Sequence, residues 1–376
     1  MTINLKVQTN DDHSARLSRF ILFSLVGLAL LHAINIVLVY NLEPSRYPLG
    51  ANEPIFRYWD AAHYTTITVR GYFSTLWAYY PLYPLLVRIF APAMGLNSRP
   101  EIAGAILSAG LFIAFCVTQA RLVKSNERPQ WITPATIGGW ICFLFSPSSY
   151  IFHTNHTESL FLVLSFAAFY TAWKAQWKTA ALLAGLCALT RHQGILVAIA
   201  IALHVALQRK DWRDRSRVFV SSGLVSFLLF ALYPLYQFFE TGSPFTFLQV
   251  RAHWRTVDSF YAWIGTLWYA SPWQVPNWRD HLHLLFFFLL CTAAAYLFKK
   301  KQYSLALYTF LSTITVLFQG EMVDMFRFGS VIFPALFVLG DLIMRLPRPL
   351  QWAVLGAVVW FNLIYTRLYA LGEWAY

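Results

Sequence analysis

Long apolar runs recur along the whole chain and constrain its fold more than any other feature. A run of about 20 residues can cross a hydrocarbon layer roughly 30 Å thick as a helix. The 376 residues are 58% hydrophobic and only 12% charged, whereas a soluble domain carries roughly 25% charged residues. A membrane β-barrel would instead show alternating segments of about 10 residues. The sequence therefore predicts an all-α, polytopic membrane protein.

The positions of the basic residues predict how these runs cross the membrane. The net charge of +12 could suggest a nucleic-acid partner, but the basic residues cluster in short segments between the runs, so we expect none. The clusters are Arg16 and Arg19; Arg121, Lys124 and Arg128; Lys174 and Lys178; 209–217; 299–301; and Arg345 with Arg348. The positive-inside rule places all of these clusters in the cytoplasm, which requires an even number of crossings between successive clusters. The following spans meet that condition: about 20–40, 101–121, 132–151, 157–173, 179–190, 194–208, 218–239, 281–298, 303–319, 328–345 and 350–371. We expect about eleven spans, with the N-terminus inside and the C-terminus outside; nine or ten remain open, because two middle runs are short.

We expect one transmembrane domain over residues 1–376. It would have a disordered cytoplasmic tail at 1–15, a first outer loop at 41–100 and a second long outer segment at 240–280. The first run has no cleavage signature and is interpreted as a retained anchor. The cysteines lie inside apolar runs, without the spacing of a disulfide framework or a zinc site. Five tryptophans of the second outer segment, at 254, 263, 268, 273 and 278, suit an interfacial belt.

The predicted topology brings ionisable residues from five parts of the chain to the outer face. They are Asp60 and His63; His153, Asn155, His156 and Glu158; Arg191 and His192; the segment 240–280; and Glu321, Asp324 and Arg327. A transporter would place such groups near the midplane, on broken helices. Groups at helix ends on one side are typical of an enzyme that works at the interface.

The most informative segment runs from Arg57 to Tyr64, directly outside the first span. It holds an acid, Asp60, and an imidazole, His63, among aromatic residues. Ionisable groups at a membrane are costly to desolvate and are functional-site candidates by default. The stretch 71–85 that follows is rich in aromatics and proline, which favours helices lying in the headgroup region.

Several motifs together resemble the PIG-V-like (GPI mannosyltransferase 2-like) mannosyltransferases, a branch of the GT-C glycosyltransferase superfamily. They are Trp-Asp-Ala-Ala-His-Tyr at 59–64 with Gly-Tyr at 71–72 and Tyr-Pro-Leu-Tyr-Pro-Leu at 80–85; Thr-Glu-Ser-Leu-Phe at 157–161; Ala-Leu-Thr-Arg at 188–191 with Gly194; 241–249 with Trp254; and Arg-Phe at 327–328 with Phe-Pro at 333–334. The motifs keep the family's order over roughly 55–335. His192 departs from the family pattern, which often has proline there. The compact chain is more similar to a prokaryotic relative than to the longer eukaryotic enzymes.

This resemblance implies a GT-C-type helical fold and a glycosyltransferase. We expect the enzyme to invert the anomeric centre, because no second carboxylate is evident to form a covalent sugar intermediate, and we expect no cofactor. The enzyme would move a sugar, expected to be mannose, from a polyprenyl-phosphate donor to a lipid-linked or other glycan acceptor. Its active site would lie on the non-cytoplasmic face of the plasma membrane, or of the endoplasmic reticulum in a eukaryote, in contact with membrane lipids. In GT-C enzymes the first outer loop carries the catalytic acid residue, which here is Asp60.

The chemistry of the residues fits this expectation. An attacking hydroxyl needs a base, and the leaving phosphate needs fixed donors or positive charge. We predict Asp60 and His63 as catalytic residues. Arg57, Tyr64, Glu158, Arg191, His192 and Arg327 are predicted to bind substrate, and no metal site is expected.

Each candidate has a plainer interpretation. Asp60 could cap a helix or pair with Arg57, and His63 could pack on Trp59. Arg191 and Arg327 could hold lipid headgroups instead of the donor phosphate. The residues His153, His156 and Glu158 do not follow a zinc-site spacing and could be solvated or capping groups. At the level of function, the alternatives are a lipid or glycolipid transporter and a non-catalytic scaffold of a glycan assembly complex.

Overall fold

The computed structural model describes residues 3–42, 54–125, 129–251, 278–319 and 324–375, and these are helical throughout except for loops and one isolated bridge. The long helices are α1 (Ile3–Leu42), α4 (Pro100–Lys124), α9 (Trp212–Thr241), α12 (Trp278–Lys299) and α16 (Arg348–Ala370). The shorter ones are α2 (Asp60–Arg70), α3 (Leu82–Ala93), α5 (Ile137–Leu144), α6 (Glu158–Trp173), α7 (Trp177–Ala188), α8 (Gln193–Leu207), α10 (Thr246–Arg251), α13 (Tyr303–Ile314), α14 (Met325–Ser330) and α15 (Phe333–Ile343). Single 3-10 turns are η1 (Ile55–Arg57), η2 (Ser74–Ala78), η3 (Ser149–His153) and η5 (Thr315–Gln319).

Five helices are long and apolar enough to cross a membrane: 12–39 within α1, α4, α9, 281–299 within α12, and α16. Six shorter apolar helices lie among them in the described part of the chain. The predicted all-α class is thus confirmed for the described residues, and the chain is a multi-pass membrane protein. The count of about eleven spans stays a prediction, since several predicted runs form helices of fewer than 18 residues.

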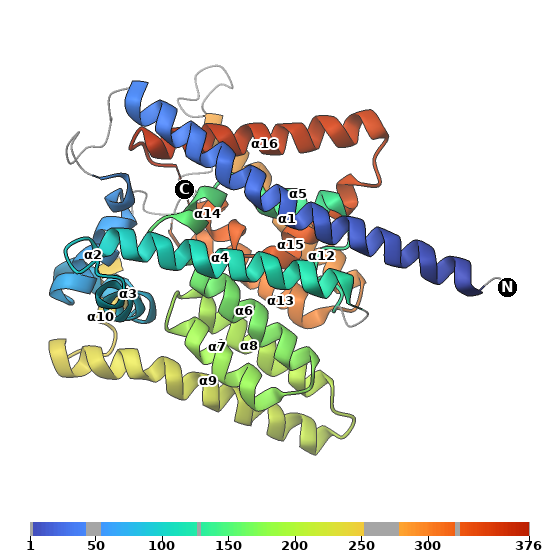
Figure 1. The fold of residues 1–376 in the computed structure, drawn as a ribbon. Coiled ribbons are helices and arrows are strands. Elements are labelled where there is room, and N and C mark those ends of the chain that lie inside the picture. The colour runs from blue at the N-terminus through green and yellow to red at the C-terminus, as the bar shows by residue number, and fades with distance from the viewer. Residues whose placement is uncertain (1–2, 43–53, 126–128, 252–277, 320–323, 376) are drawn as a thin grey trace, which may run out of the picture.

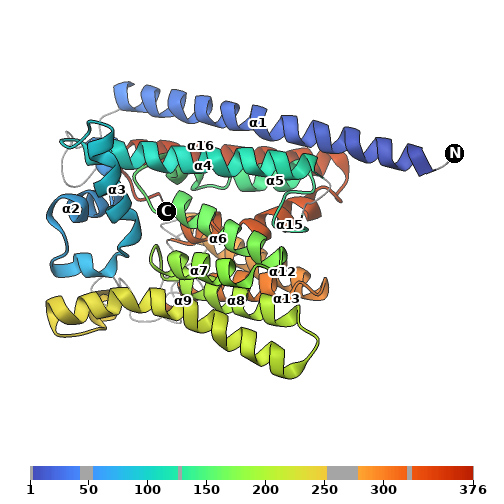
Figure 2. The same ribbon diagram turned by 60° about the horizontal axis from the view of Figure 1, so that its bottom comes forward.

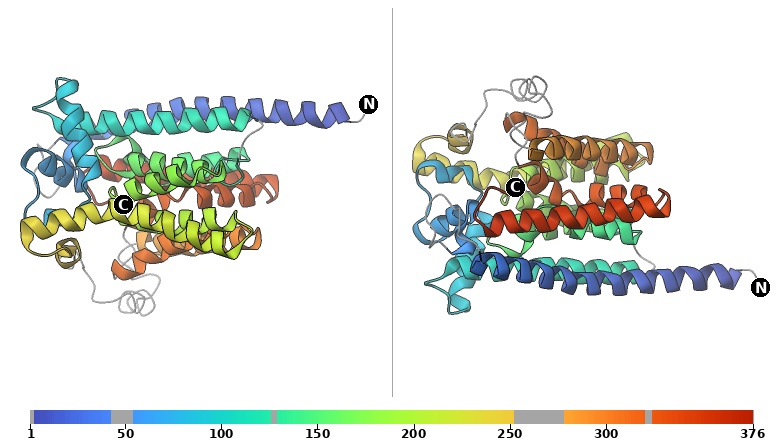
Figure 3. Two further views of the ribbon diagram at one scale, coloured as in Figure 1. Left: turned by 90° about the horizontal axis from the view of Figure 1, so that it is seen from below. Right: turned by 90° about the horizontal axis from the view of Figure 1, so that it is seen from above.

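The long helices run side by side along one axis (Figures 2 and 3). Helix α1 packs on α4 and α16 along one side, and α7 packs on α6, α8 and α9 along the other. Helices α2 and α3 gather at one end of the bundle, opposite the N-terminus (Figure 1). The basic loops after α8, α12 and α15 lie at the other end (Figure 2). The structure therefore separates the loop that carries Asp60 from the basic loops.

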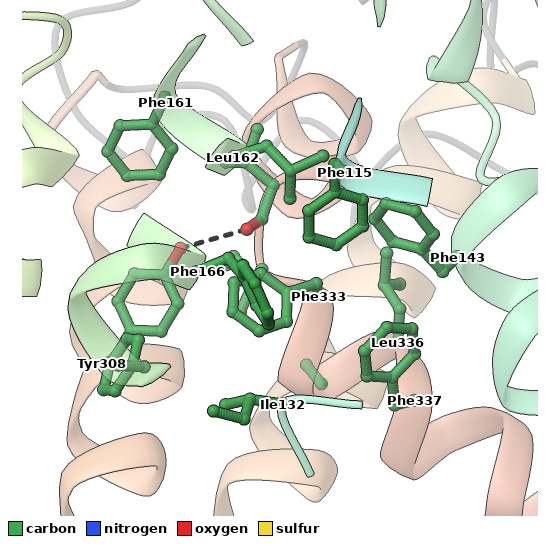
Figure 4. Close-up of a cluster of buried hydrophobic side chains, with 14 of the residues drawn as sticks. Phe115, Ile132, Phe143, Phe161, Leu162, Phe166, Tyr308, Phe333, Leu336 and Phe337 are labelled. Carbon is green, nitrogen blue, oxygen red and sulfur yellow. Dashed lines mark hydrogen bonds between the residues drawn. The ribbon is translucent and has the colours of Figure 1, made fainter. Parts of the chain in front are cut away.

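A buried aromatic cluster fills the middle of the bundle. Phe115 of α4, Phe166 of α6 and Phe333 of α15 contact one another within it (Figure 4). The hydroxyl of Tyr308 donates to the Val331 carbonyl at 3.1 Å, which satisfies its polar end inside the apolar core. This packing fixes α6, α13 and α15 relative to one another; Glu158 begins α6, and Arg327 lies on α14, directly before α15.

Two local features differ from the sequence predictions. The tail predicted to be disordered, 1–15, is helical from Ile3 onward, because α1 continues back from its apolar span. An ion pair between Arg16 and Asp12 on the exposed face supports that extension. The predicted run 132–151 contains only the short helix α5, followed by a loop and η3, because Pro147 interrupts it.

The second long outer segment lies mostly outside the described residues. This includes Trp254, Trp263, Trp268 and Trp273 of the predicted belt, and Glu321 falls in a second gap.

Candidate active site

Asp60 is the first residue of α2 and receives a donor on each carboxylate oxygen. Arg327 donates from Nη1 to Oδ2 at 2.5 Å, and the Tyr79 hydroxyl donates to Oδ1 at 2.9 Å. The Asp60 side chain keeps 16% of its surface exposed. The carboxylate is therefore held by two donors, on a side chain that is not completely buried.

Arg327 joins two carboxylates from distant parts of the chain. Its Nε donates to Oε1 of Glu158 at 2.5 Å, while its Nη1 holds Asp60. Glu158 begins α6 and is fully buried, and Arg327 lies on α14 with 5% of its surface exposed. One planar guanidinium thus ties α2, α6 and α14 together, a geometry that lysine cannot reproduce.

Arg191 completes the cluster from the turn between α7 and α8. It pairs with Glu158 and also donates to the Thr157 hydroxyl at 3.0 Å. Its guanidinium lies over the ring of Phe328, 5.4 Å from the ring centre. Asp60, Glu158, Arg191 and Arg327, here called the charge cluster, carry two negative and two positive charges. Burial of an isolated charge costs a large desolvation free energy, and the pairing of opposite charges in the cluster offsets much of that cost.

The turn that carries Arg191 depends on a glycine. A Cβ at Gly194 would lie 2.1 Å from the backbone carbon of Cys187. Only glycine allows the start of α8 to approach the end of α7 this closely. The close approach places the chain between them, including Arg191, against Glu158.

Asn155 fixes α2 beside the cluster. Its side-chain amide donates to the Ala61 carbonyl at 3.2 Å and to the Thr65 hydroxyl at 3.0 Å, both on α2. It accepts from the Tyr83 hydroxyl at 2.9 Å. Asn155 is buried, and its hydrogen bonds connect the segment before α6 to α2, the helix that begins with Asp60.

The charges set the acidity of the groups that lie outside the apolar helices. Burial alone would raise the pKa of Asp60, but Arg327, together with His63 and His156, holds that pKa well below its usual range. Burial lowers the pKa of His63, although Asp60 opposes the effect, and burial lowers the pKa of His156 to about 4. Burial also raises the pKa of Tyr64 to about 12. At neutral pH, Asp60 is a carboxylate and His156 is uncharged.

The other predicted site residues border the cluster to different degrees. Tyr64 is buried, with its hydroxyl 3.5 Å from that of Thr157. His63 is half-buried on α2, and its ring lies 5.1 Å from that of Tyr79. The ring of His192 lies edge to face with that of Phe328, with centres 5.4 Å apart. Arg57 is half-buried in η1, one turn before Asp60.

Two residues that contact the cluster directly, Tyr79 and Thr157, were not among the predicted site residues, although one adjoins and the other begins a motif named above. Tyr79 precedes the Tyr-Pro-Leu-Tyr-Pro-Leu motif, and Thr157 begins the Thr-Glu-Ser-Leu-Phe motif. A hydroxyl next to a candidate carboxylate or arginine in such a motif is a usable signal for a hydrogen-bond partner.

The three residues considered as a metal set do not converge. The ring of His153 lies against His32, 5.4 Å between centres, and His156 bonds to the Thr154 hydroxyl at 2.8 Å. Across the described ranges, no group of three or more His, Cys, Asp or Glu side chains is placed to hold a metal.

Comparison with known protein families identifies the family of this chain. Residues 53–282, more than half of the chain, match the family model "Mannosyltransferase (PIG-V)". The chain belongs to this PIG-V mannosyltransferase family. The match includes Asp60, Glu158 and Arg191 of the charge cluster and ends before Arg327. The resemblance predicted from the motifs is thereby confirmed.

Two curated relatives agree with the family. The chain is 32% identical over 146 residues to GPI mannosyltransferase 2 of Schizosaccharomyces pombe, which covers 38% of this chain and 30% of that protein. It is 24% identical over 277 residues to GPI mannosyltransferase 2 of Drosophila pseudoobscura, which covers 61% of each chain. The chain thus spans less than two thirds of either relative. No solved structure matches it.

Proposed function

We propose that this PIG-V family protein is an inverting mannosyltransferase that takes its sugar from a polyprenyl-phosphate donor. The acceptor is a lipid-linked or other glycan hydroxyl, and the reaction takes place at the non-cytoplasmic face. The observation that carries the proposal is the buried charge cluster at the α2 end of the bundle, where a partly exposed carboxylate is bonded to an arginine. Its setting in a helical bundle whose first outer loop holds the carboxylate supports a GT-C-type architecture.

Asp60 is the base in this mechanism. The acceptor oxygen forms a bond to the anomeric carbon while the bond from that carbon to the phosphate oxygen breaks. The acceptor proton passes to Asp60, and the polyprenyl phosphate leaves with the electron pair. Direct displacement inverts the anomeric centre. General-base help of this kind contributes typically about 10²–10⁴-fold.

Arg327 links the base to the leaving group. In the structure its guanidinium neutralises Asp60 and lowers the pKa of that carboxyl, which weakens Asp60 as a base. A donor phosphate competes for the same guanidinium, because arginine binds phosphate and carboxylate in the same forked geometry. As Arg327 turns toward the phosphate, the pKa of Asp60 rises and its basicity returns. The base is thus strengthened only when the donor is bound.

The proposal is tested with purified protein in vesicles. The protein is incubated with native lipid extract and a panel of radiolabelled polyprenyl-phosphate sugars, among them mannose and glucose. We expect labelled glycolipid from the mannose donor only. Movement of intact labelled donor across the vesicle membrane without any new product would instead support the transporter alternative. The absence of both product and transport would support the scaffold alternative.

A further inference from the structure

The backbone immediately before Asp60 adopts a conformation that tryptophan rarely takes. Trp59 has φ 55° and ψ −127°. The amide of Ala61 donates to the Tyr58 carbonyl at 3.2 Å, so the chain turns tightly with Trp59 and Asp60 at the centre. These angles match the first central position of a type II′ turn, where glycine is the usual residue. A tryptophan stays there only if its surroundings hold it.

Residues 372–375, here called the strap, supply those surroundings. Helix α16 ends in a Schellman-type cap: Glu373 N donates to the Leu368 carbonyl at 3.0 Å, and Gly372 N donates to the Tyr369 carbonyl at 2.9 Å. Gly372 has φ 79°, which lets the chain leave the helix axis. In Figures 1 and 2 the C-terminal end lies toward the α2 end of the bundle, away from the N-terminus.

The strap contacts Trp59 in two ways. The indole Nε1 of Trp59 donates to the Glu373 carbonyl at 3.1 Å. The rings of Trp59 and Trp374 meet edge to face, with centres 4.8 Å apart. The hydrogen bond fixes the direction of the indole and the ring contact packs against it, so together they restrict rotation of the Trp59 backbone.

The strap is itself anchored by two other parts of the fold. At the start of α12, Arg279 pairs with the Glu373 carboxylate at 2.8 Å and donates to the Trp374 carbonyl at 3.1 Å. In η3, the Tyr150 hydroxyl donates to the Ala375 carbonyl at 2.7 Å. Ala375 has only 1% of its surface exposed. The strap that contacts Trp59 is thus itself held in place by α12 and η3.

We propose that the strap positions the base: by holding Trp59 in its strained turn, it directs the carboxylate of Asp60 at Arg327. The inference rests on the proposed function, because it treats Asp60 as the base. Trp59, Arg279 and Trp374 are then positioning residues that act through Asp60 and touch no substrate. Without the strap, Trp59 relaxes to an ordinary backbone conformation and the first turn of α2 changes direction.

The test compares Trp374→Ala and Arg279→Gln with the wild type in the full chain. We expect kcat to fall by about 10- to 100-fold, the loss typical of a misplaced catalytic group, with little change in the KM for donor. Hydrogen exchange of the amides at 58–64 should become faster. Arg345→Gln is the matched control, since its guanidinium contacts the Tyr296 hydroxyl between α12 and α15; it should leave both readouts unchanged.

The pH profile separates positioning from a merely structural role. If Asp60 loses contact with Arg327 in a strap variant, its pKa rises, and the acid limb of kcat/KM moves to higher pH than in the wild type. A simple loss of folded protein lowers the rate equally at every pH. Trp374→Phe keeps an aromatic ring against Trp59 and should retain most of kcat.

A double variant keeps the test decisive if Trp374→Ala folds poorly. Glycine accepts the turn without strain, so Arg279→Gln, which lowers kcat in the wild-type background, should have little further effect on kcat in a Trp59→Gly background. Effects of equal size in both backgrounds overturn the proposal, as does normal kcat with normal exchange at 58–64 in the single variants. Hydrogen exchange can be measured without turnover. If the wild type transfers no sugar, the proposed function is contradicted, but exchange at 58–64 still tests whether the strap holds the turn at Trp59.

Discussion

At the residue scale, the bond between Asp60 and Arg327 joins two parts of the chain that are 267 positions apart. The sequence suggested both residues but not the pairing, because the plainer partner for Asp60 was the nearby Arg57. Arg327 also holds Glu158. Its dual role makes the arginine both a structural bridge and the candidate phosphate ligand.

Arg327→Lys is expected to reduce donor affinity and turnover together. Lysine keeps the charge but cannot reach two carboxylates and a phosphate with fixed, forked donors. Arg327→Ala should be worse, since removal of one partner of a buried pair costs about 3–5 kcal/mol. Donor titration and thermal unfolding of the purified variants measure both effects. Unchanged donor affinity and turnover in Arg327→Ala would show that the arginine only bridges the two carboxylates and binds no donor.

The low pKa of Asp60 predicts how stability depends on pH. Burial opposes ionisation, but Arg327 outweighs it, so the folded-state pKa lies below the unfolded value of about 3.9. The ionised pair therefore stabilises the fold fully above that pH, and the stabilisation is lost as pH falls toward the folded pKa. The stability difference between wild type and Asp60→Asn should be constant from about pH 8 to 5 and should shrink below about pH 4. Thermal unfolding across this range measures it, and a difference that grows on acidification would mean that burial dominates.

At the element scale, the short helices matter more to the site than the long ones. Glu158 begins α6, Arg191 lies between α7 and α8, and Arg327 lies on α14, a single short helix. The apolar runs predicted these helices approximately. Their exact ends, which decide where each charged side chain points, depend on close contacts such as that of Gly194 with Cys187. Contacts between elements leave little trace in a single sequence.

Gly194→Ala is predicted to destabilise the turn that carries Arg191. The new methyl group would meet the backbone of Cys187, which cannot move without separating α7 from α8. Overpacking of this kind costs typically about 1–3 kcal/mol. Gly223→Ala is the control, because no atom lies within 4 Å of its added Cβ on α9, and alanine should be neutral or stabilising there. Equal melting temperatures for the two variants would contradict the prediction.

At the scale of the whole molecule, composition and hydropathy were enough to predict a helical membrane protein and the separation of basic loops from the Asp60 loop. The ordered motifs were enough to predict the family. The sequence could not predict that Trp59 is strained, nor that residues 372–375 return to it, because both follow from packing between distant segments. The sequence therefore predicted a set of candidate site residues, whereas the ion pairs and hydrogen bonds between them are seen only in the structure.

Sidedness can be tested by cysteine labelling in intact cells. Ser74 lies at the α2 end of the bundle and is exposed, and Ser216 lies in the basic segment at the start of α9. In a background without the four native cysteines, an impermeant maleimide should label Ser74→Cys but not Ser216→Cys. Labelling at 216 and protection at 74 would invert the topology and move the site to the cytoplasmic face.

The central claim, that Asp60 is the base of a glycosyl transfer, is tested most directly by the turnover of Asp60→Asn. Asparagine keeps the size of the side chain and can still accept a hydrogen bond from Arg327, but it cannot take the acceptor proton. Turnover should fall by about 10²-fold or more, with donor binding close to normal, and the wild-type product should have inverted anomeric configuration. A near-normal rate for Asp60→Asn, or a wild-type product with retained configuration, would contradict the account.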